Sequence, residues 1–267
     1  MEFSGNLIKM KTKFAEPVEY TLYSDESIIP VSEMLGKKIR LNYNGKINCI
    51  KCGRKIKKTF MQGYCYPCFI SLPETDACIL HPEKCRAHLG ISRDMAWSEK
   101  NCLQEHYVYL AVSSGLKVGV TRKSQIPDRW IDQGAWKAVK IAKTPNRFLA
   151  GSIEVALKDF LNDKTNWRKM LQNKVDGNID LISEKEKARE NLADEFVPYF
   201  LEDHEIITIN YPVLAYPEKV KSISLDKIGT VEGILTGIKG QYLIIDNFYV
   251  LNIRKHNGYF VEIEISG

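Results

Sequence analysis

The chain has 267 residues, of which 44% are apolar and 27% are charged, and its net charge is +5. This length can bury a core, and the composition, without repeats or low-complexity tracts, is typical of a folded soluble protein. It excludes a membrane-spanning protein, because no apolar run approaches the ~18 residues that a spanning helix needs. The first residues also lack the apolar run of a signal peptide, so we expect a cytoplasmic protein.

Both ends of the chain predict short β-strands. Residues 1–48 contain segments that alternate between apolar and polar side chains, and Asn44-Gly45 is a pair typical of a hairpin turn. Residues 206–267 contain short segments rich in β-branched and aromatic side chains, separated by Gly, Pro and Asn. Neither end is large enough for a core of its own. We therefore predict an α+β chain in which the two ends combine into one small β barrel or sandwich.

All seven cysteines lie between Cys49 and Cys102. In a chain without an export signal, such a cluster indicates metal binding rather than disulfides. Cys49 and Cys52 form one Cys-x2-Cys pair, and Cys65 and Cys68 form a second. Each pair can place two thiolates on one tight turn, and two such turns complete a tetrahedral shell for a structural zinc ion.

A second group of candidate zinc ligands follows the first. Its members are Cys78, His81, Cys85, His88, Cys102 and His106. They exceed the four positions of a zinc site, so spacing alone does not fix the ligand set. We favour the three cysteines with His106 as the fourth ligand, which His81 or His88 could replace. The competing interpretation is that Cys78 and Cys102 are buried apolar residues and that the histidines lie at the surface. A metal bound here would supply much of the folding energy of segment 49–104.

Residues 105–205 predict an α/β module with trailing helices. Its elements are strands at 107–112 and 117–121 around the turn Ser113-Ser114-Gly115, a helix at 124–134, a strand at 136–142 and a helix at 146–161. The predicted order is therefore ββαβα.

This unit resembles the GIY-YIG nuclease superfamily. The sequence YVY at residues 107–109 corresponds to the first signature and KVG at 117–119 to the second, and helices with Arg129 and Glu154 follow. Over nearly its full length the chain also resembles a bacterial protein family that combines these cysteine pairs with the sequence LKVGVTR…RWIDQGA.

The resemblance implies a site that cleaves phosphodiester bonds. Tyr109 would help to activate water, Arg129 would steady the phosphate and Glu154 would bind one Mg²⁺ or Mn²⁺ ion. A metal and a guanidinium at the phosphate stabilise the charge that develops on its oxygens. Two positions depart from the pattern: Tyr107 replaces a glycine, and Lys117 replaces the tyrosine of the second signature. A lysine at this position could contact phosphate or, in a desolvated site, act as a base.

Basic residues are distributed unevenly along the chain. Between Lys46 and Phe60 there is no acidic residue, and the basic ones are Lys46, Lys51, Arg54, Lys55, Lys57 and Lys58. The candidate phosphate-binding residues elsewhere are Lys117, Arg122, Lys123, Arg129, Lys239, Arg254 and Lys255. Clustered basic residues beside aromatic ones favour a phosphate-bearing partner over a neutral one, although a solvated basic face is the simpler alternative.

The sequence therefore favours a zinc-containing nucleic-acid-binding protein. RNA is preferred over DNA, because zinc knuckles and a β-rich terminal domain occur with modest basicity and without a recognisable major-groove helix. The module is expected to be either a divalent-metal-dependent nuclease or a catalytically inactive derivative of one. The alternative is a zinc-stabilised scaffold that docks on a protein or a ribonucleoprotein. A nucleotide-modifying enzyme is disfavoured, because the chain has no Walker loop, dinucleotide fingerprint or nucleophile elbow.

Overall fold

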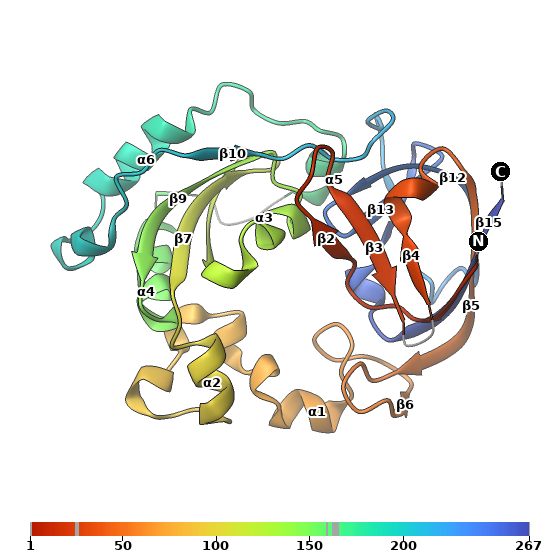
Figure 1. Ribbon diagram of the computed structural model, residues 1–267, viewed down its shortest axis with the longest axis horizontal. Coiled ribbons are helices and arrows are strands. Elements are labelled where there is room, and N and C mark those ends of the chain that lie inside the picture. Colours follow the sequence, from red (N-terminus) through yellow and green to blue (C-terminus); the bar gives the residue numbers. More distant parts are fainter. Residues whose placement is uncertain (1, 25–26, 159, 162–165, 267) are drawn as a thin grey trace. The chain divides into compact units, whose positions relative to one another are not determined.

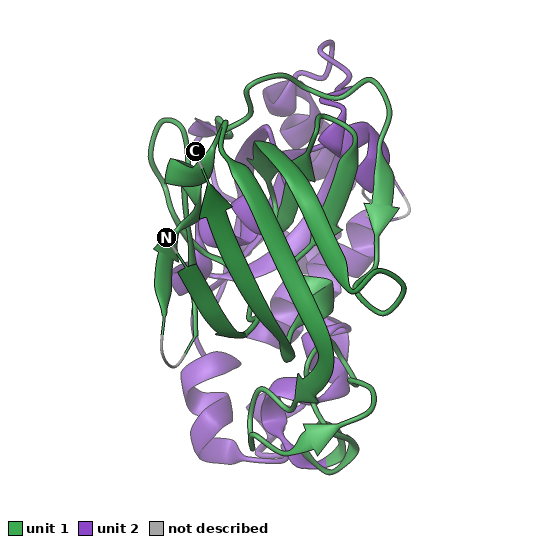
Figure 2. Ribbon diagram, turned by 90° about the vertical axis from the view of Figure 1, so that its right-hand side faces the viewer, with its two compact units in different colours: residues 1–70, 209–267 green, residues 71–208 purple. Residues whose placement is uncertain are grey.

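A computed structural model describes residues 2–24, 27–158, 160–161 and 166–266. The chain is an α+β protein with several sheets, and it divides into two compact units. Unit 1 comprises residues 1–70 and 209–267, and unit 2 comprises residues 71–208 (Figure 2). Figure 1 labels the helices and strands. The two ends of the chain thus lie in one unit, and the segment with the seven cysteines is divided between the two.

The main feature of unit 1 is an eight-stranded sheet (Figure 2). Its path is β1 (Glu2–Asn6), β15 (Tyr259–Ser266), β5 (Lys38–Asn48), β12 (Thr230–Lys239), β13 (Tyr242–Ile245), β14 (Tyr249–Asn252) and β11 (Lys221–Ile223), and β6 (Lys55–Ile56) pairs with the end of β5. The β11–β14 pair is parallel and the other pairs are antiparallel. Because β1 and β11 end the path without pairing to each other, the described strands form no closed barrel.

Strand β5 runs through the residues that predict a hairpin turn. Asn44 and Gly45 lie within β5, and Gly45 has a φ of +84°. The register with β15 shifts at this point, since Tyr259 faces Ile47 whereas Val261 faces Tyr43. The predicted turn is therefore wrong: the left-handed glycine forms a bulge in a continuous strand.

A smaller sheet completes unit 1. It consists of β2 (Lys11–Lys13), β3 (Glu19–Tyr23) and β4 (Ile28–Pro30). The side chain of Gln241 joins the N-terminal segment to the turn after β12, because its amide accepts from the Met10 N–H at 2.8 Å and donates to the Met10 carbonyl at 3.1 Å. Gln241 is buried, so this turn is a packed connection rather than a free loop.

Unit 2 contains a four-stranded antiparallel sheet in the order β10 (Ile206–Thr208), β9 (Lys137–Thr144), β7 (His106–Val112) and β8 (Leu116–Arg122). Its helices are α2 (Met95–Asn101), α3 (Asp128–Asp132), α4 (Arg147–Lys158), α5 (Trp167–Leu171) and α6 (Leu181–Glu190). From β7 to α4 the chain follows the ββαβα order that the sequence predicts. Ile206–Thr208, which the sequence groups with the terminal strands, pairs instead with β9.

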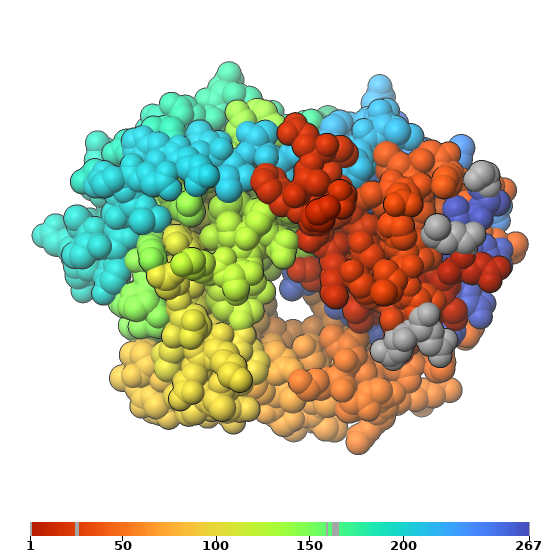
Figure 3. Space-filling model, in the orientation of Figure 1, coloured from red at the N-terminus to blue at the C-terminus, as the bar shows by residue number. Residues whose placement is uncertain are grey.

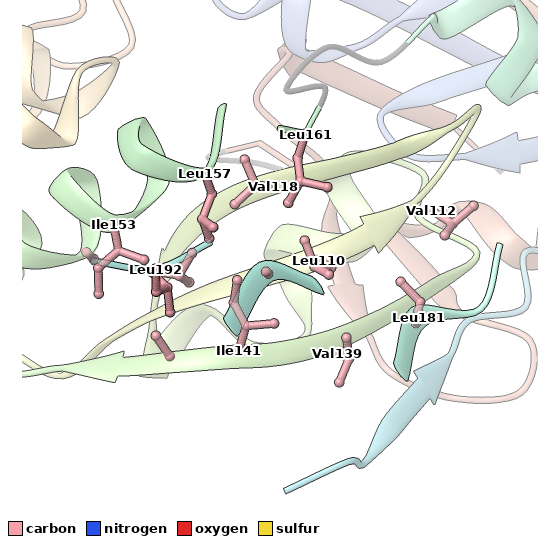
Figure 4. Close-up of a cluster of buried hydrophobic side chains, with 14 residues drawn as sticks. Leu110, Val112, Val118, Val139, Ile141, Ile153, Leu157, Leu161, Leu181 and Leu192 are labelled. Atoms are coloured by element: carbon pink, nitrogen blue, oxygen red, sulfur yellow. The ribbon is translucent and has the colours of Figure 1, made fainter. Parts of the chain in front are cut away.

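The core of unit 2 lies on one face of this sheet. Leu110 and Val118 contribute from β7 and β8, Ile153 and Leu157 from α4, and Leu181 from α6 (Figure 4). Alternate residues of β7 point to the opposite face, so Tyr109 is separated from this core by the sheet. None of the helices in the described part of the chain combines the length and apolar character that crossing a bilayer requires.

A buried histidine in unit 1 provides a test of this fold. The His256 ring is 1% exposed; its Nδ1 donates to the Asn252 carbonyl at 2.7 Å and its Nε2 accepts from the Leu225 N–H at 3.2 Å. Only the neutral ring makes both bonds, and burial lowers the pKa of His256 below its ordinary value of 6.5. His256 therefore binds a proton more readily in the unfolded chain than in the folded chain. As the pH falls from 6.5 toward the folded pKa, this difference lowers the free energy of unfolding.

We expect the stability advantage of the wild type over His256→Gln to be constant above pH 7 and to shrink below pH 6.5. The loss is about 1.4 kcal/mol for each unit by which the pKa is depressed. Chemical denaturation from pH 5 to 8 measures the difference in free energy of unfolding between the two proteins. Any loss of metal in acid affects both proteins equally and therefore does not contribute to this difference. His204→Gln is the control, because His204 is half exposed and pairs with Glu186. A difference independent of pH would contradict the prediction.

Candidate functional site

The first cysteine cluster lies in unit 1, directly after β5. Cys49 and Cys52 belong to a tight turn, and Cys65 and Cys68 flank the start of helix α1 (Tyr66–Ser71). The four Sγ atoms all lie within 4.8 Å of one another. The Cys65 N–H donates to Cys49 Sγ at 3.2 Å, a bond that stabilises a thiolate.

Glycines allow both turns of this cluster. Gly53 has a φ of +69° and its N–H donates to the Cys49 carbonyl at 2.9 Å. Gly63 has a φ of +134°, and its carbonyl accepts from the Ile50 N–H at 3.0 Å. A Cβ at Gly63 would lie 2.8 Å from the Ile50 side chain, so the two loops approach each other closely only because this position is glycine.

The cluster is preorganised for a cation. Burial opposes ionisation of Cys49, but N–H donors from Cys52, Cys65 and Lys51 outweigh it and lower the pKa of Cys49 to about 6. Four mutually close sulfur donors fit the tetrahedral shell of a structural zinc ion and leave no position for a substrate. This cluster can therefore hold zinc. A zinc ion bound there would stabilise the fold of residues 49–68.

The second cluster lies in unit 2 and consists of Cys78, Cys85 and Cys102. Their Sγ atoms lie within 4.8 Å of one another, and all three side chains are buried. Hydrogen bonds from Cys78 and Cys85, together with the nearby charge of Arg147, lower the pKa of Cys102 despite its burial. Three close thiols, one of them readily ionised, form a donor set that can also hold zinc. The interpretation of these cysteines as isolated apolar residues is disfavoured by this convergence.

The three histidines differ in their suitability as the fourth ligand. His81 is exposed and pairs with Glu83 at 3.5 Å, and His88 is exposed and stacks on Phe148 with ring centroids 4.5 Å apart. His106 is 1% exposed, and burial lowers its pKa to about 4, so the ring is neutral. None of them lies within the 4.8 Å group.

His106 nevertheless has the hydrogen-bonding pattern of a metal ligand. Its Nδ1 donates to the Gln104 carbonyl at 2.7 Å, whereas its Nε2 is buried and has no hydrogen-bond partner among the described residues. In zinc sites, a ligating histidine typically donates its other nitrogen in this way. The ring is also near enough to Cys102 for that thiol to affect its pKa. His106 therefore fits the fourth position best, and the ring would have to move toward the sulfurs to bind.

The second cluster is attached to helix α4. A Cβ at Gly151 would overlap the backbone of Pro82 and Glu83, so the turn before Cys85 packs directly on the helix. Arg147 donates from its backbone to the Cys102 carbonyl at 2.8 Å and from its side chain to the Asn101 carbonyl at 3.1 Å. Sequence reasoning missed both Arg147 and Gly151, because these contacts depend on tertiary packing.

Of the side chains assigned to catalysis, Tyr109 and Lys117 meet at Gln133. The Tyr109 hydroxyl donates to Gln133 Oε1 at 3.1 Å, and the Lys117 ammonium donates to the same oxygen. Burial raises the pKa of Tyr109; the nearby Arg129 opposes this effect and Glu154 adds to it. Gln133, which follows helix α3, joins the cluster; its place there depends on the packing of α3 and not on a sequence motif.

Glycine at position 119 makes this arrangement possible. Gly119 faces Tyr109 in the β7–β8 register, and a Cβ there would lie 2.6 Å from the Tyr109 hydroxyl. The tyrosine ring therefore lies across the neighbouring strand, where Trp130 covers it at a centroid distance of 5.7 Å. Much of the cluster is buried: Tyr109 is 0% exposed, Lys117 and Glu154 are buried, and Arg129 and Gln133 are half-buried. Glu154 also pairs with Lys158 at 3.7 Å.

The remaining candidates for phosphate binding are dispersed. Arg122 donates to the Asn101 side chain, near the second cluster, and Lys123 pairs with Glu105 at 2.7 Å. Lys239 is 1% exposed and lies 5.2 and 5.0 Å from the ring centroids of Tyr211 and Tyr216.

Because Lys239 is buried, its ammonium is not presented at a surface, and the same burial lowers its pKa to about 8. Arg254 is half-buried and Lys255 is exposed on the turn Arg254–His256. Arg122 and Lys123 belong to unit 2, whereas Lys239, Arg254 and Lys255 belong to unit 1.

We expect metal analysis of the purified chain to give two zinc ions, with Cys65→Ser reducing the content to one. Cobalt substituted into the remaining site of Cys65→Ser should then show the absorption of a tetrahedral ion with three thiolates and one nitrogen. His106→Ala should change that spectrum, because it removes the nitrogen donor.

His81→Ala and His88→Ala, made in the same Cys65→Ser background, are the matched controls and should leave the cobalt spectrum unchanged. Circular dichroism of each variant verifies that it is folded. A spectrum that responds to His81 or His88 and not to His106 would contradict the assignment.

No curated protein and no solved structure matches the chain. One family model, described as "Protein of unknown function (DUF2797)", matches residues 36–261. The matched range includes both cysteine clusters and every residue around Tyr109. Because the match spans most of its length, the chain belongs to the DUF2797 family.

Proposed function

We propose that this chain is a zinc-containing nucleic-acid-binding protein whose binding surface is the ribbon formed by residues 46–70. RNA is the preferred partner, as the sequence predicts. The observation that carries the proposal is the exposed positive charge of this segment, which a structural zinc ion would hold in one shape.

The charge of the ribbon is both one-sided and accessible. Lys46, Arg54, Lys55, Lys57 and Lys58 are all exposed, and the sequence contains no acidic residue between Glu33 and Glu74. Segment 46–70 lies at the molecular surface, where it is coloured orange (Figure 3). Exposed cations without acidic residues among them favour binding of a polyanion to the ribbon, because each phosphate contact releases a condensed counterion.

The closed site around Tyr109 supports a second candidate function, cleavage of phosphodiester bonds. Lys117 and Tyr109 share Gln133, and the charges of Arg129 and Glu154 both affect the pKa of Tyr109. Glu154 would hold a Mg²⁺ or Mn²⁺ ion that stabilises charge on the phosphate, and Arg129 would orient it. A phosphate can reach Tyr109 only if its cover moves. Binding is therefore the primary proposal and cleavage the secondary one.

Removing charge from the ribbon should weaken nucleic-acid binding and its dependence on salt. We expect Lys55→Ser/Lys57→Ser/Lys58→Ser to lower the affinity for RNA and to reduce the slope of log K against log[salt] by about 2. Fluorescence anisotropy over a range of salt concentrations measures both quantities.

The matched control is Lys219→Ser/Lys221→Ser/Lys227→Ser, which removes the same charge from other exposed positions of unit 1. Equal effects of the two triple variants would contradict the assignment of the site to the ribbon. Failure of the wild type to bind RNA or DNA at low salt would remove the proposal and leave the zinc-stabilised scaffold.

The second candidate function has its own measurement. Wild-type protein with Mg²⁺ or Mn²⁺ should cleave single-stranded RNA or DNA, and Glu154→Gln should lose at least about 100-fold in cleavage rate while it retains binding, because the metal ligand is gone. Glu99→Gln, at an exposed position of the same unit, is the control. Cleavage that survives in Glu154→Gln, or no cleavage with either metal, would exclude this function.

A further inference from the structure

The ribbon also carries a cluster of aromatic rings beside its cations. Phe60 lies 5.3 Å from Tyr66 and 5.8 Å from Phe69 between ring centroids, and the Phe60 and Phe69 rings are nearly parallel, at 20°. The Lys58 ammonium lies 5.2 Å from the centroid of the Phe60 ring. Aromatic faces and positive charge therefore occur together on the ribbon.

Helix α1 is unusual because it is apolar and exposed. It contains no buried residue, although its sequence is YPCFIS. Tyr66 is 56% exposed and Ile70 is 51% exposed. Burying such side chains would be favourable, so their exposure beside a charged surface indicates an interaction site.

The aromatic cluster is held rigidly. Phe60 and Tyr64 exchange two backbone hydrogen bonds, of 2.8 and 3.0 Å, around Met61 and Gln62, which both have positive φ. The Gln62 carbonyl also accepts from the side chain of Asn257 at 3.0 Å, which ties the loop to the large sheet of unit 1. Little conformational entropy is therefore lost when a ligand binds to these rings.

The chemistry of the cluster distinguishes between two forms of nucleic acid. Within a duplex, each base is stacked on its neighbours and its faces are covered, so an exposed ring has no partner there. Unpaired bases present free faces, and stacking on an aromatic side chain contributes about 1–3 kcal/mol per base. A protein partner would also cover apolar side chains, but the exposed cations of the ribbon, whose sequence contains no acidic residue, favour an anionic strand over an apolar peptide.

We infer that the ribbon is a single-strand-specific site, in which a base stacks on Tyr66 while Arg54, Lys55, Lys57 and Lys58 hold the flanking phosphates. Phe60 contacts the Tyr66 ring and stacks with Phe69, so these two rings extend the platform. This inference rests on the proposed function. It adds that the ligand is single-stranded and that Tyr66 is the residue that distinguishes a single strand from a duplex.

The test measures binding of the full-length zinc protein to an oligouridine of about 12 nucleotides, within the ~4–16 nucleotides that one single-strand site covers, and to a duplex RNA of the same length. We expect the single strand to bind more tightly at equal salt. Tyr66→Leu, which keeps an apolar side chain on α1, should weaken single-strand binding about 5- to 100-fold with little effect on the duplex. Tyr66→Trp should retain the affinity, because it restores a stacking face.

Tyr249→Leu is the matched control, since Tyr249 is another exposed aromatic residue of unit 1, 37% exposed and in edge contact with Phe248. Zinc content confirms that each variant keeps the metal-bound ribbon.

The outcomes separate the two proposals. Equal binding of duplex and single strand, with no effect of Tyr66→Leu, would overturn this inference and leave the nucleic-acid-binding function intact. No binding of either probe by the wild type at low salt would overturn both.

Discussion

Unit 1 depends on the pairing of strand β5. This strand pairs with β15 on one side, with β12 on the other and with β6 at its end, so it joins the N-terminal segment to strands more than 180 residues later. Cys49 follows the last residue of β5 directly, and the Asn48 N–H donates to the Gly258 carbonyl at 2.8 Å. The first cysteine cluster is thus directly continuous with the largest sheet, and the pairing of β5 fixes the position of Cys49.

In both units, a cysteine cluster holds irregular chain against regular structure. The first cluster closes two loops beside β5 and β6, and the second closes a series of short 3-10 turns on helix α4. The turns around Cys78 and Cys85 are too short to bury much apolar surface, so the free energy of metal binding would contribute to their folding directly. Metal binding would therefore determine the shape of the surfaces that these turns form.

Local patterns predicted the features that depend on nearby residues. The ββαβα order follows from hydrophobic periodicity, and the two Cys-x2-Cys pairs follow from ligand spacing. Features set by long-range packing were not predictable: Gly45 forms a bulge because β15 pairs across it, and Gln133 enters the polar cluster because α3 packs on the face of Tyr109. The burial of Lys239 between two tyrosines has the same origin, since nothing in the surrounding sequence distinguishes it from an exposed turn lysine.

Solvent access is the property that separates the two candidate sites. In unit 2, Tyr109 and Lys117 are buried and hydrogen-bonded to Gln133, and the buried Trp130 packs against the Tyr109 ring. On the ribbon, the cations and the Tyr66 ring are already exposed, and the loop beside them is held by backbone hydrogen bonds, so a ligand can bind without rearrangement. Residues 46–70 contain no Asp or Glu, so the ribbon itself supplies no carboxylate for a catalytic metal. The ribbon is therefore suited to binding alone, and any cleavage would require the separate site in unit 2 to open.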